Sequence, residues 1–281
     1  MKKTFVFILF LFIIIISKSH AQSDTSLKTG WTPRGTVALN LSQISFSNWV
    51  QGGEDALSFA GLGHFGVLYH SKKWDFYNFL KLAYGKSKSS GTVKTTDNEL
   101  RFNTLLIRHL GWKVNPYFSN EVRSSISNGY DYSVTPEVQT TAFFDPGYIT
   151  QSLGFIYSVK RFSSRLGVGL QEVITNKFTN FSDDPETADK VEKFKLETGI
   201  ESVTEANLDL MQNILYSSRL RLFSRFNSLD VWDVNWDNII TAKVNDYINV
   251  NLSVNMIYEK KASMKTQIKE ALQVGFSYLI F

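Results

Sequence analysis

Apolar and polar residues alternate along most of this 281-residue chain, and this two-residue period constrains the fold more than any other feature. The segment 248–258, for example, reads INVNLSVNMIY, so that apolar side chains alternate with Asn and Ser. A helix repeats every 3.6 residues and would mix the two kinds of side chain, whereas a strand puts them on opposite faces. Segments of about 9–11 residues are long enough for tilted strands to cross a bilayer.

Twelve such segments can be placed along the chain. They are predicted at 36–47, 57–69, 74–86, 98–110, 117–127, 148–159, 164–175, 195–207, 214–226, 234–244, 247–258 and 267–280. The connections between them alternate between short and long, with 87–97 and 127–147 among the long ones. This alternation is typical of outer-membrane barrels, which have short periplasmic turns and longer outer loops. The sequence therefore predicts an all-β protein, a closed antiparallel transmembrane β-barrel of about 12 strands.

Prolines and aromatic residues support the same arrangement. All five prolines lie outside the predicted strands, as expected where a closed barrel has no edge to accommodate a missing N–H donor. Aromatic residues gather at the predicted strand ends, with Trp74 and Trp112 on the side of the short turns and Trp232 and Trp236 on the side of the loops. Such rings are typical of the two membrane interfaces.

The N-terminus has the pattern of a secretory signal. Lys2 and Lys3 precede an apolar run over 5–16, and Ala21 ends a small-residue cleavage motif. We therefore predict a signal peptide over 1–21, a lead-in segment over 22–35 and the barrel over 36–281. Removing the three lysines of the signal changes 30 basic residues to 27, against 26 acidic ones, so no nucleic-acid partner is expected. The chain has no Cys and therefore no disulfide framework.

Several short motifs resemble one known family. They are Leu41-Ser42-Gln43-Ile44-Ser45-Phe46-Ser47-Asn48-Trp49, Gly52-Gly53-Glu54, Lys94-Thr95-Thr96-Asp97, Asn128-Gly129-Tyr130-Asp131-Tyr132, Val234-Asn235-Trp236 and Val274-Gly275-Phe276-Ser277-Tyr278. Together they resemble a Bacteroidota outer-membrane β-barrel family of unknown function, domain of unknown function 3078. The resemblance implies a barrel in the outer membrane, and it implies no catalytic residues.

Charged residues lie on the faces expected to point into the barrel. Glu residues of 195–207 and Arg residues of 214–226 form two rows that an antiparallel hairpin brings side by side. The candidate interior charges are Arg101, Glu121, Arg123, Glu197, Glu201, Glu205, Arg219, Arg221, Arg225 and Asp237, with Lys243 and Lys269 beside them. They form either a pore wall that discriminates by charge or an interior filled by ion pairs, and the second interpretation is favoured. Twelve strands lie between the roughly 8 that side chains can fill and the roughly 16 that leave a channel.

Other candidate residues carry weaker signals. His64, His70 and His109 lie on separate segments, and their spacing predicts neither a metal site nor a catalytic cluster. The residues Asn48, Trp49, Gly52, Gly53 and Glu54 form a candidate outer-rim motif. It is either a ligand or partner site, or a glycine-enabled turn with Trp49 at the membrane interface.

Three functions remain open at this point. The first is a small, weakly selective channel for small solutes, with at most a mild anion preference. The second is a non-conducting structural or partner subunit of an outer-membrane complex, which a charge-paired interior would support. The third and least favoured is a lipid-modifying enzyme, and the sequence predicts no enzyme and no cofactor. The expected partners are outer-membrane lipid, the barrel-assembly machinery and a protein partner of unknown identity.

Overall fold

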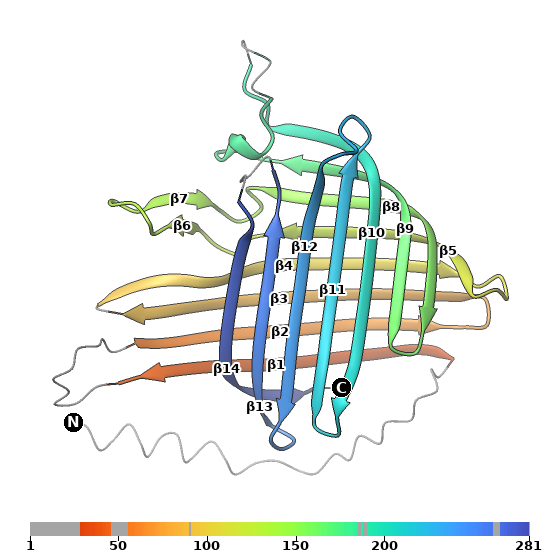
Figure 1. Ribbon diagram of the computed structural model, residues 1–281, viewed down its shortest axis with the longest axis horizontal. Helices are drawn as coiled ribbons and strands as arrows, with labels where there is room; N and C mark the ends of the chain where they lie inside the picture. The colour runs from red at the N-terminus through yellow and green to blue at the C-terminus, as the bar shows by residue number, and fades with distance from the viewer. Residues whose placement is uncertain are drawn as a thin grey trace.

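The computed structural model describes residues 29–45, 56–89, 91–184, 187, 190–260 and 265–280 (Figure 1). The predicted signal peptide over 1–21 lies outside these residues. Within the described part of the chain, no helix is long and apolar enough to cross a membrane. The helical structure recorded there is a single 3-10 turn, η1, at Thr179–Phe181.

Twelve strands close into one antiparallel barrel, in the order β1-β14-β13-β12-β11-β10-β9-β8-β5-β4-β3-β2. The barrel strands are β1 Gly30–Ile44, β2 Ala56–His70, β3 Trp74–Ser89, β4 Thr92–Arg108, β5 Val114–Ser124, β8 Gly147–Val159, β9 Phe162–Ile174, β10 Phe194–Met211, β11 Ile214–Arg225, β12 Trp232–Lys243, β13 Ile248–Tyr258 and β14 Gln267–Leu279. The barrel closes where β1 pairs with β14, from Thr36 opposite Leu279 to Leu41 opposite Val274. Each of the twelve predicted strands overlaps one of these, which confirms the predicted fold.

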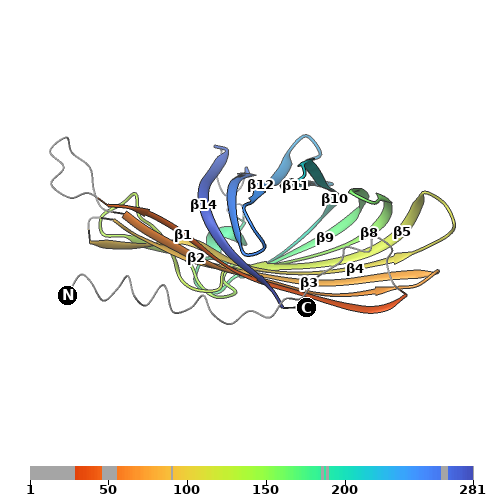
Figure 2. The same cartoon turned by 90° about the horizontal axis from the view of Figure 1, so that it is seen from below.

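Strands on opposite walls cross one another. Figure 1 shows β11 to β14 running across β1 to β4, and Figure 2 shows the two walls facing each other. This crossing follows from closure, because strands must tilt against the axis to form a barrel and the tilt reverses in projection on the far wall. Long side chains from one wall therefore point toward those of the other.

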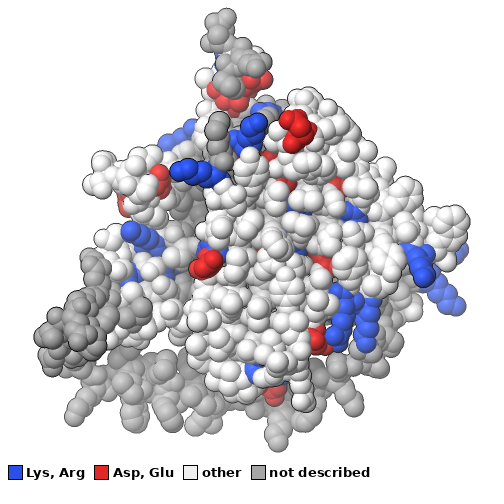
Figure 3. Space-filling view, in the orientation of Figure 1, with Lys and Arg blue, Asp and Glu red and all other residues white. Residues whose placement is uncertain are grey.

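Alternation along each strand separates an apolar outside from a mostly polar inside. On β8, Leu153 and Phe155 are 66% and 61% exposed, whereas their neighbour Ser152 is 2% exposed. On β14, Leu272 and Phe276 point outward in the same way. Figure 3 shows a broad area without charged side chains over the wall that faces the viewer. Soluble proteins rarely expose so large an apolar surface, whereas a bilayer-spanning barrel requires one.

The strands differ from the predicted ones at several ends. β1 begins at Gly30, so the last part of the predicted lead-in over 22–35 belongs to the barrel. Residues 87–97, predicted as a long loop, mostly continue two strands, because β3 ends only at Ser89 and β4 already begins at Thr92. Their polar residues indicated a loop, but backbone pairing continues beyond the apolar belt into water. The predicted loop over 127–147 carries a small sheet of β6, Gly129–Asp131, and β7, Val138–Thr141.

Two prolines lie inside strands, so the expectation that all five avoid them is wrong. Pro33 belongs to β1 and Pro116 to β5. Pro33 lies three residues before Thr36, where pairing with β14 begins, and Pro116 lies one residue before Tyr117, where pairing with β4 begins. Each proline therefore has a neighbouring strand on one side only, and the missing N–H breaks no ladder.

The connections define two ends of the barrel. We call the turn side the end with the short connections 71–73, 109–113, 160–161, 212–213 and 244–247. We call the loop side the opposite end, at which β1, β3, β5, β9, β11 and β13 end. Trp112 and Trp74 lie at the turn side, 79% and 40% exposed, which suits an interfacial position.

Candidate functional site

The ten candidate interior charges share the inward face of the barrel wall. Strand alternation places Glu197, Glu201 and Glu205 of β10 on the face that also carries the buried Val203. Arg123 lies over the ring of Tyr148, 4.9 Å from its centroid. The other candidate charges form ion pairs, which are described strand by strand below. We call this set, with the partners named below, the interior network.

A buried ion pair joins Glu201 on β10 to Arg221 on β11. The Nε of Arg221 lies 2.8 Å from Oε1 of Glu201, and the two side chains are 6% and 4% exposed. Ser152 Oγ donates a hydrogen bond of 2.6 Å to the other carboxylate oxygen. Arg221 Nη2 also donates to Gln171 Oε1 at 2.9 Å. Both charges are thus removed from water and held by several hydrogen bonds, as a buried pair must be.

A second buried group centres on Arg225, at the loop side of β11. Its guanidinium lies 2.7 Å from Glu197 of β10 through Nε and 2.7 Å from Asp233 of β12 through Nη2. The Arg225 side chain is 4% exposed. Its planar fork of donors contacts two carboxylates at once, an arrangement that fixes the positions of three adjacent strands.

One bond crosses the full interior of the barrel. Arg101 on β4 donates from Nη1 to Oδ2 of Asp237 on β12 at 3.1 Å. These strands are six positions apart in the ring of twelve, so they lie on opposite walls. Arg101 also pairs with Glu99 at 2.6 Å, and Glu99 pairs with Lys81 at 2.7 Å. A chain of charges therefore runs from β3 across the interior to β12.

Two further ion pairs cross parts of the interior. Arg219 of β11 lies 2.5 Å from Glu121 of β5, and Lys269 of β14 lies 2.5 Å from Asp97 of β4. In each pair the strands are four positions apart in the ring. Side chains from both walls therefore meet inside the barrel at several levels. Arg219 also contacts Glu205, whose side chain is 41% exposed.

Uncharged side chains occupy the space around the interior network. Phe223 and Val203 are 0% and 1% exposed, and Thr150 accepts a hydrogen bond of 3.3 Å from Arg221. Thr150 and Ser152 of β8 therefore bind other side chains and do not line water. Toward the turn side, Ile107, Tyr117 and Ile156 form an apolar cluster.

A small cavity lies within the interior network, near the loop side. It has about 10 Å³ of room for water and is lined in part by Arg123, Asp233 and Glu259. This volume is about enough for one water molecule. The cavity is therefore far too small to be a solute-sized passage.

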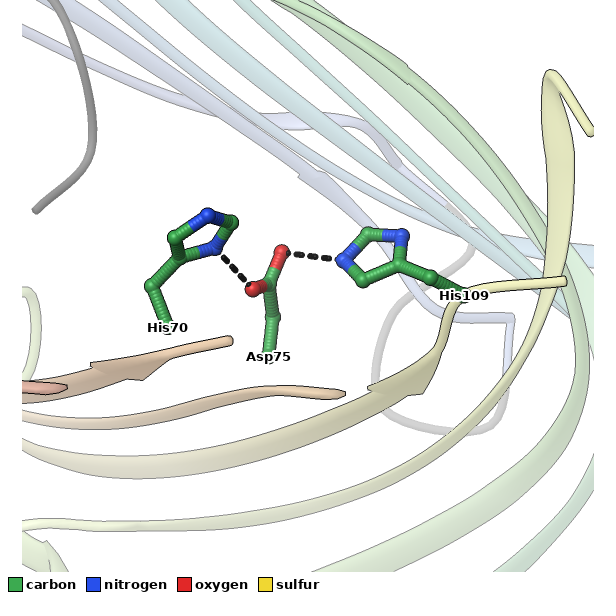
Figure 4. Close-up of side chains that lie close together, drawn as sticks. All are labelled: His70, Asp75 and His109. Carbon is green, nitrogen blue, oxygen red and sulfur yellow. Dashed lines mark hydrogen bonds and ion pairs between the residues drawn. The ribbon is translucent and has the colours of Figure 1, made fainter. Parts of the chain in front are cut away.

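A cluster that the sequence did not predict lies at the turn side (Figure 4). Asp75 at the start of β3 accepts from both imidazoles: His70 Nδ1 lies 2.5 Å from Oδ1, and His109 Nε2 lies 2.8 Å from Oδ2. The three residues are grouped closely enough to hold a metal ion. The spacing of His70 and His109 predicted no such cluster, but pairing across β2, β3 and β4 brings both imidazoles to one carboxylate.

Sequence reasoning also missed several members of the interior network, namely Lys81, Glu99, Asp97 and Asp233. Glu99 carried a signal, because it lies two residues before Arg101 on the same predicted strand. Asp97 and Asp233 each lie one residue before a predicted strand and belong to β4 and β12 only in the structure. The candidate rim motif (Asn48, Trp49, Gly52, Gly53 and Glu54) lies outside the described residues.

The fold and the interior network define a closed β-barrel with an apolar exterior and a charge-bridged interior. The sequence pattern of a protein family of unknown function (DUF3078) matches residues 41–130. A search of curated proteins finds no relative of the chain.

Three similar solved structures are barrels with low sequence identity to this chain. An outer membrane channel from Pseudomonas putida F1 is 10% identical, with 92% of this chain and 98% of that chain covered and a TM-score of 0.40. The translocator domain of the autotransporter NalP from Neisseria meningitidis is 9% identical, with 91% of this chain and 90% of that chain covered and a TM-score of 0.38. The CymD monoaromatic hydrocarbon channel is 8% identical, with 91% of this chain and 89% of that chain covered and a TM-score of 0.35. These identities are too low to transfer an activity.

Proposed function

We propose that this protein is an outer-membrane barrel with an occluded interior that acts as a structural or partner subunit. The apolar outer face and the predicted export signal support the membrane location, with the turn side toward the periplasm. We also propose an origin in Bacteroidota, from the sequence resemblance, and assembly by the barrel-assembly machinery. The proposal includes no catalytic role.

The bond between Arg101 and Asp237 carries the proposal. It joins opposite walls of the ring at 3.1 Å, so solute passing along the axis would have to break it. Beside it, inward side chains such as Glu201, Arg221 and Phe223 are no more exposed than a protein core. Opening this network would leave buried charges without partners, which costs several kcal/mol for each ion. The resting protein is therefore closed to ions.

A small channel is the second candidate, and one feature favours it. The inward face of β13 carries Asn249, Asn251, Ser253 and Asn255, which are uncharged and half-buried. A narrow polar path along this wall would open if the cross-barrel bonds were released. In that case the interior network would act as a gate.

Conductance in planar lipid bilayers distinguishes the two candidates. The wild-type protein should insert without producing current steps. If the barrel is a structural subunit, the double variant Arg101→Ala/Asp237→Ala should also be silent, because the pairs Arg219–Glu121 and Lys269–Asp97 still cross the interior. Discrete steps from this variant would instead favour the gated channel. The control is Arg161→Ala/Asp209→Ala, which removes an exposed ion pair and should remain silent. Current steps from the wild-type protein would contradict the proposal.

A further inference from the structure

We propose that His70, Asp75 and His109 form a binding site for a divalent transition-metal ion of the zinc class at the turn-side mouth of the barrel. The donor set consists of two imidazole nitrogens and one carboxylate oxygen. Zinc takes these ligands in proteins, and three of them leave a position open for water or another ligand. The site is separate from the interior network and does not depend on the proposed function.

The geometry brings three donors to one point. One ligand atom from each residue lies within 4.8 Å of the others. Ligands at about 2.0–2.2 Å from a zinc ion fit within that spacing after small side-chain rotations. Figure 4 shows the two imidazoles on either side of the Asp75 carboxylate. Both histidine side chains are 30% exposed, so an ion can reach them from the mouth.

The buried Asp75 carboxylate differs from the other buried carboxylates in its partners. Its side chain is 7% exposed, and within the described residues its ion-pair partners are His70 and His109 alone. The buried carboxylates of the interior network differ, because Glu201 and Glu121 each contact an arginine. A buried carboxylate without a permanent positive partner is costly, and a divalent ion supplies that charge.

A neighbouring group completes the site. Tyr77 lies two residues further along β3, and its hydroxyl donates to Asp75 Oδ2 at 3.2 Å. Carboxylates that bind metals are commonly held by such a second hydrogen bond, which orients the oxygen that binds the ion. Because His70 ends β2, Asp75 is the second residue of β3 and His109 follows β4, a bound ion would link three strand ends at the mouth.

Calorimetric titration of the purified, tag-free protein with Zn²⁺ tests the proposal. We expect one ion to bind per chain. His70→Ala and His109→Ala should each weaken binding by at least about a hundredfold, since even the loss of a supporting hydrogen bond weakens metal sites by about 10–100-fold. Tyr77→Phe, which keeps all three ligands, should weaken it by about tenfold. The matched control is His64→Ala, an inward histidine of the same β2 strand that packs on Phe79.

A spectroscopic measurement accompanies the titration. Co²⁺ in place of Zn²⁺ should give the visible absorption bands of a four-coordinate site, and these bands should be absent in His109→Ala. Heat-dependent gel mobility shows that each variant is folded before it is titrated. The proposal is overturned if the wild-type protein binds no Zn²⁺, or if His109→Ala binds it as tightly as wild type and His64→Ala do.

Discussion

Replacing Glu201 with alanine should destabilise the barrel by leaving Arg221 buried and without its charged partner. The two side chains are 4% and 6% exposed, and removing one partner of such a buried pair costs about 3–5 kcal/mol. Arg221 keeps its hydrogen bonds to Gln171 and Thr150, which offset part of the loss. We therefore expect a loss of about 3 kcal/mol, or roughly a hundredfold in the unfolding equilibrium constant.

Equilibrium urea unfolding, followed by tryptophan fluorescence in detergent micelles, measures this loss. Glu205→Ala is the matched control, because Glu205 lies on the same face of β10, four residues away, and pairs with Arg219. Its side chain is 41% exposed, so its loss should cost under about 1 kcal/mol. Equal losses for Glu201→Ala and Glu205→Ala would refute the reasoning, since they would mean that water reaches both pairs.

Three further predictions follow from the fold. The folded barrel should resist SDS until it is boiled, so heated and unheated samples should migrate differently on a gel; equal mobility would contradict a closed barrel. Gly167→Ala should lower the free energy of unfolding in urea by about 1–3 kcal/mol, because the added Cβ would clash with the carbonyl oxygen of Leu153. Gly61→Ala is the control and should lower it by nothing, because no atom lies nearer than 3.9 Å to its added Cβ. Burial raises the pKa of Glu259, just beyond the end of β13, so ionising this carboxyl opposes folding. Glu259→Gln should therefore raise the unfolding midpoint at pH 8, and the gain should vanish below about pH 4, where the carboxyl is protonated in both states. If Glu259→Gln still raised the unfolding midpoint in acid, burial of the ionised carboxylate would be excluded as the cause.

The strands could be predicted from the sequence because inside and outside differ chemically at every second residue. On β10 and β11, alternation alone placed Glu205 and Arg219 on the inward face, and the short turn between the strands set them opposite each other. Strand ends were less predictable. Polar residues of 87–97 resemble a loop, yet they continue a hairpin, because backbone pairing persists outside the membrane where side chains need not be apolar.

Contacts across the interior could not be predicted from local patterns. Arg101 and Asp237 are 136 residues apart, and they meet because of the strand count and stagger of the closed ring. The cluster of His70, Asp75 and His109 at the turn side could be predicted in part. The short turn over 71–73 sets His70 opposite Asp75, which a hairpin register would have shown, whereas the approach of His109 depends on the pairing of β3 with β4.

Thiol accessibility tests most directly whether the interior is closed. The chain has no cysteine, so Ser152→Cys introduces a single thiol among Ser119, Tyr117 and Glu201, at a position that is 2% exposed. Ser133→Cys, in the exposed loop between β6 and β7, is the control. A small charged methanethiosulfonate reagent, applied to folded protein in liposomes, should label the loop thiol and should label the interior thiol only after denaturation. Labelling of both thiols at the same rate in the folded protein would show a water-filled interior and contradict the account.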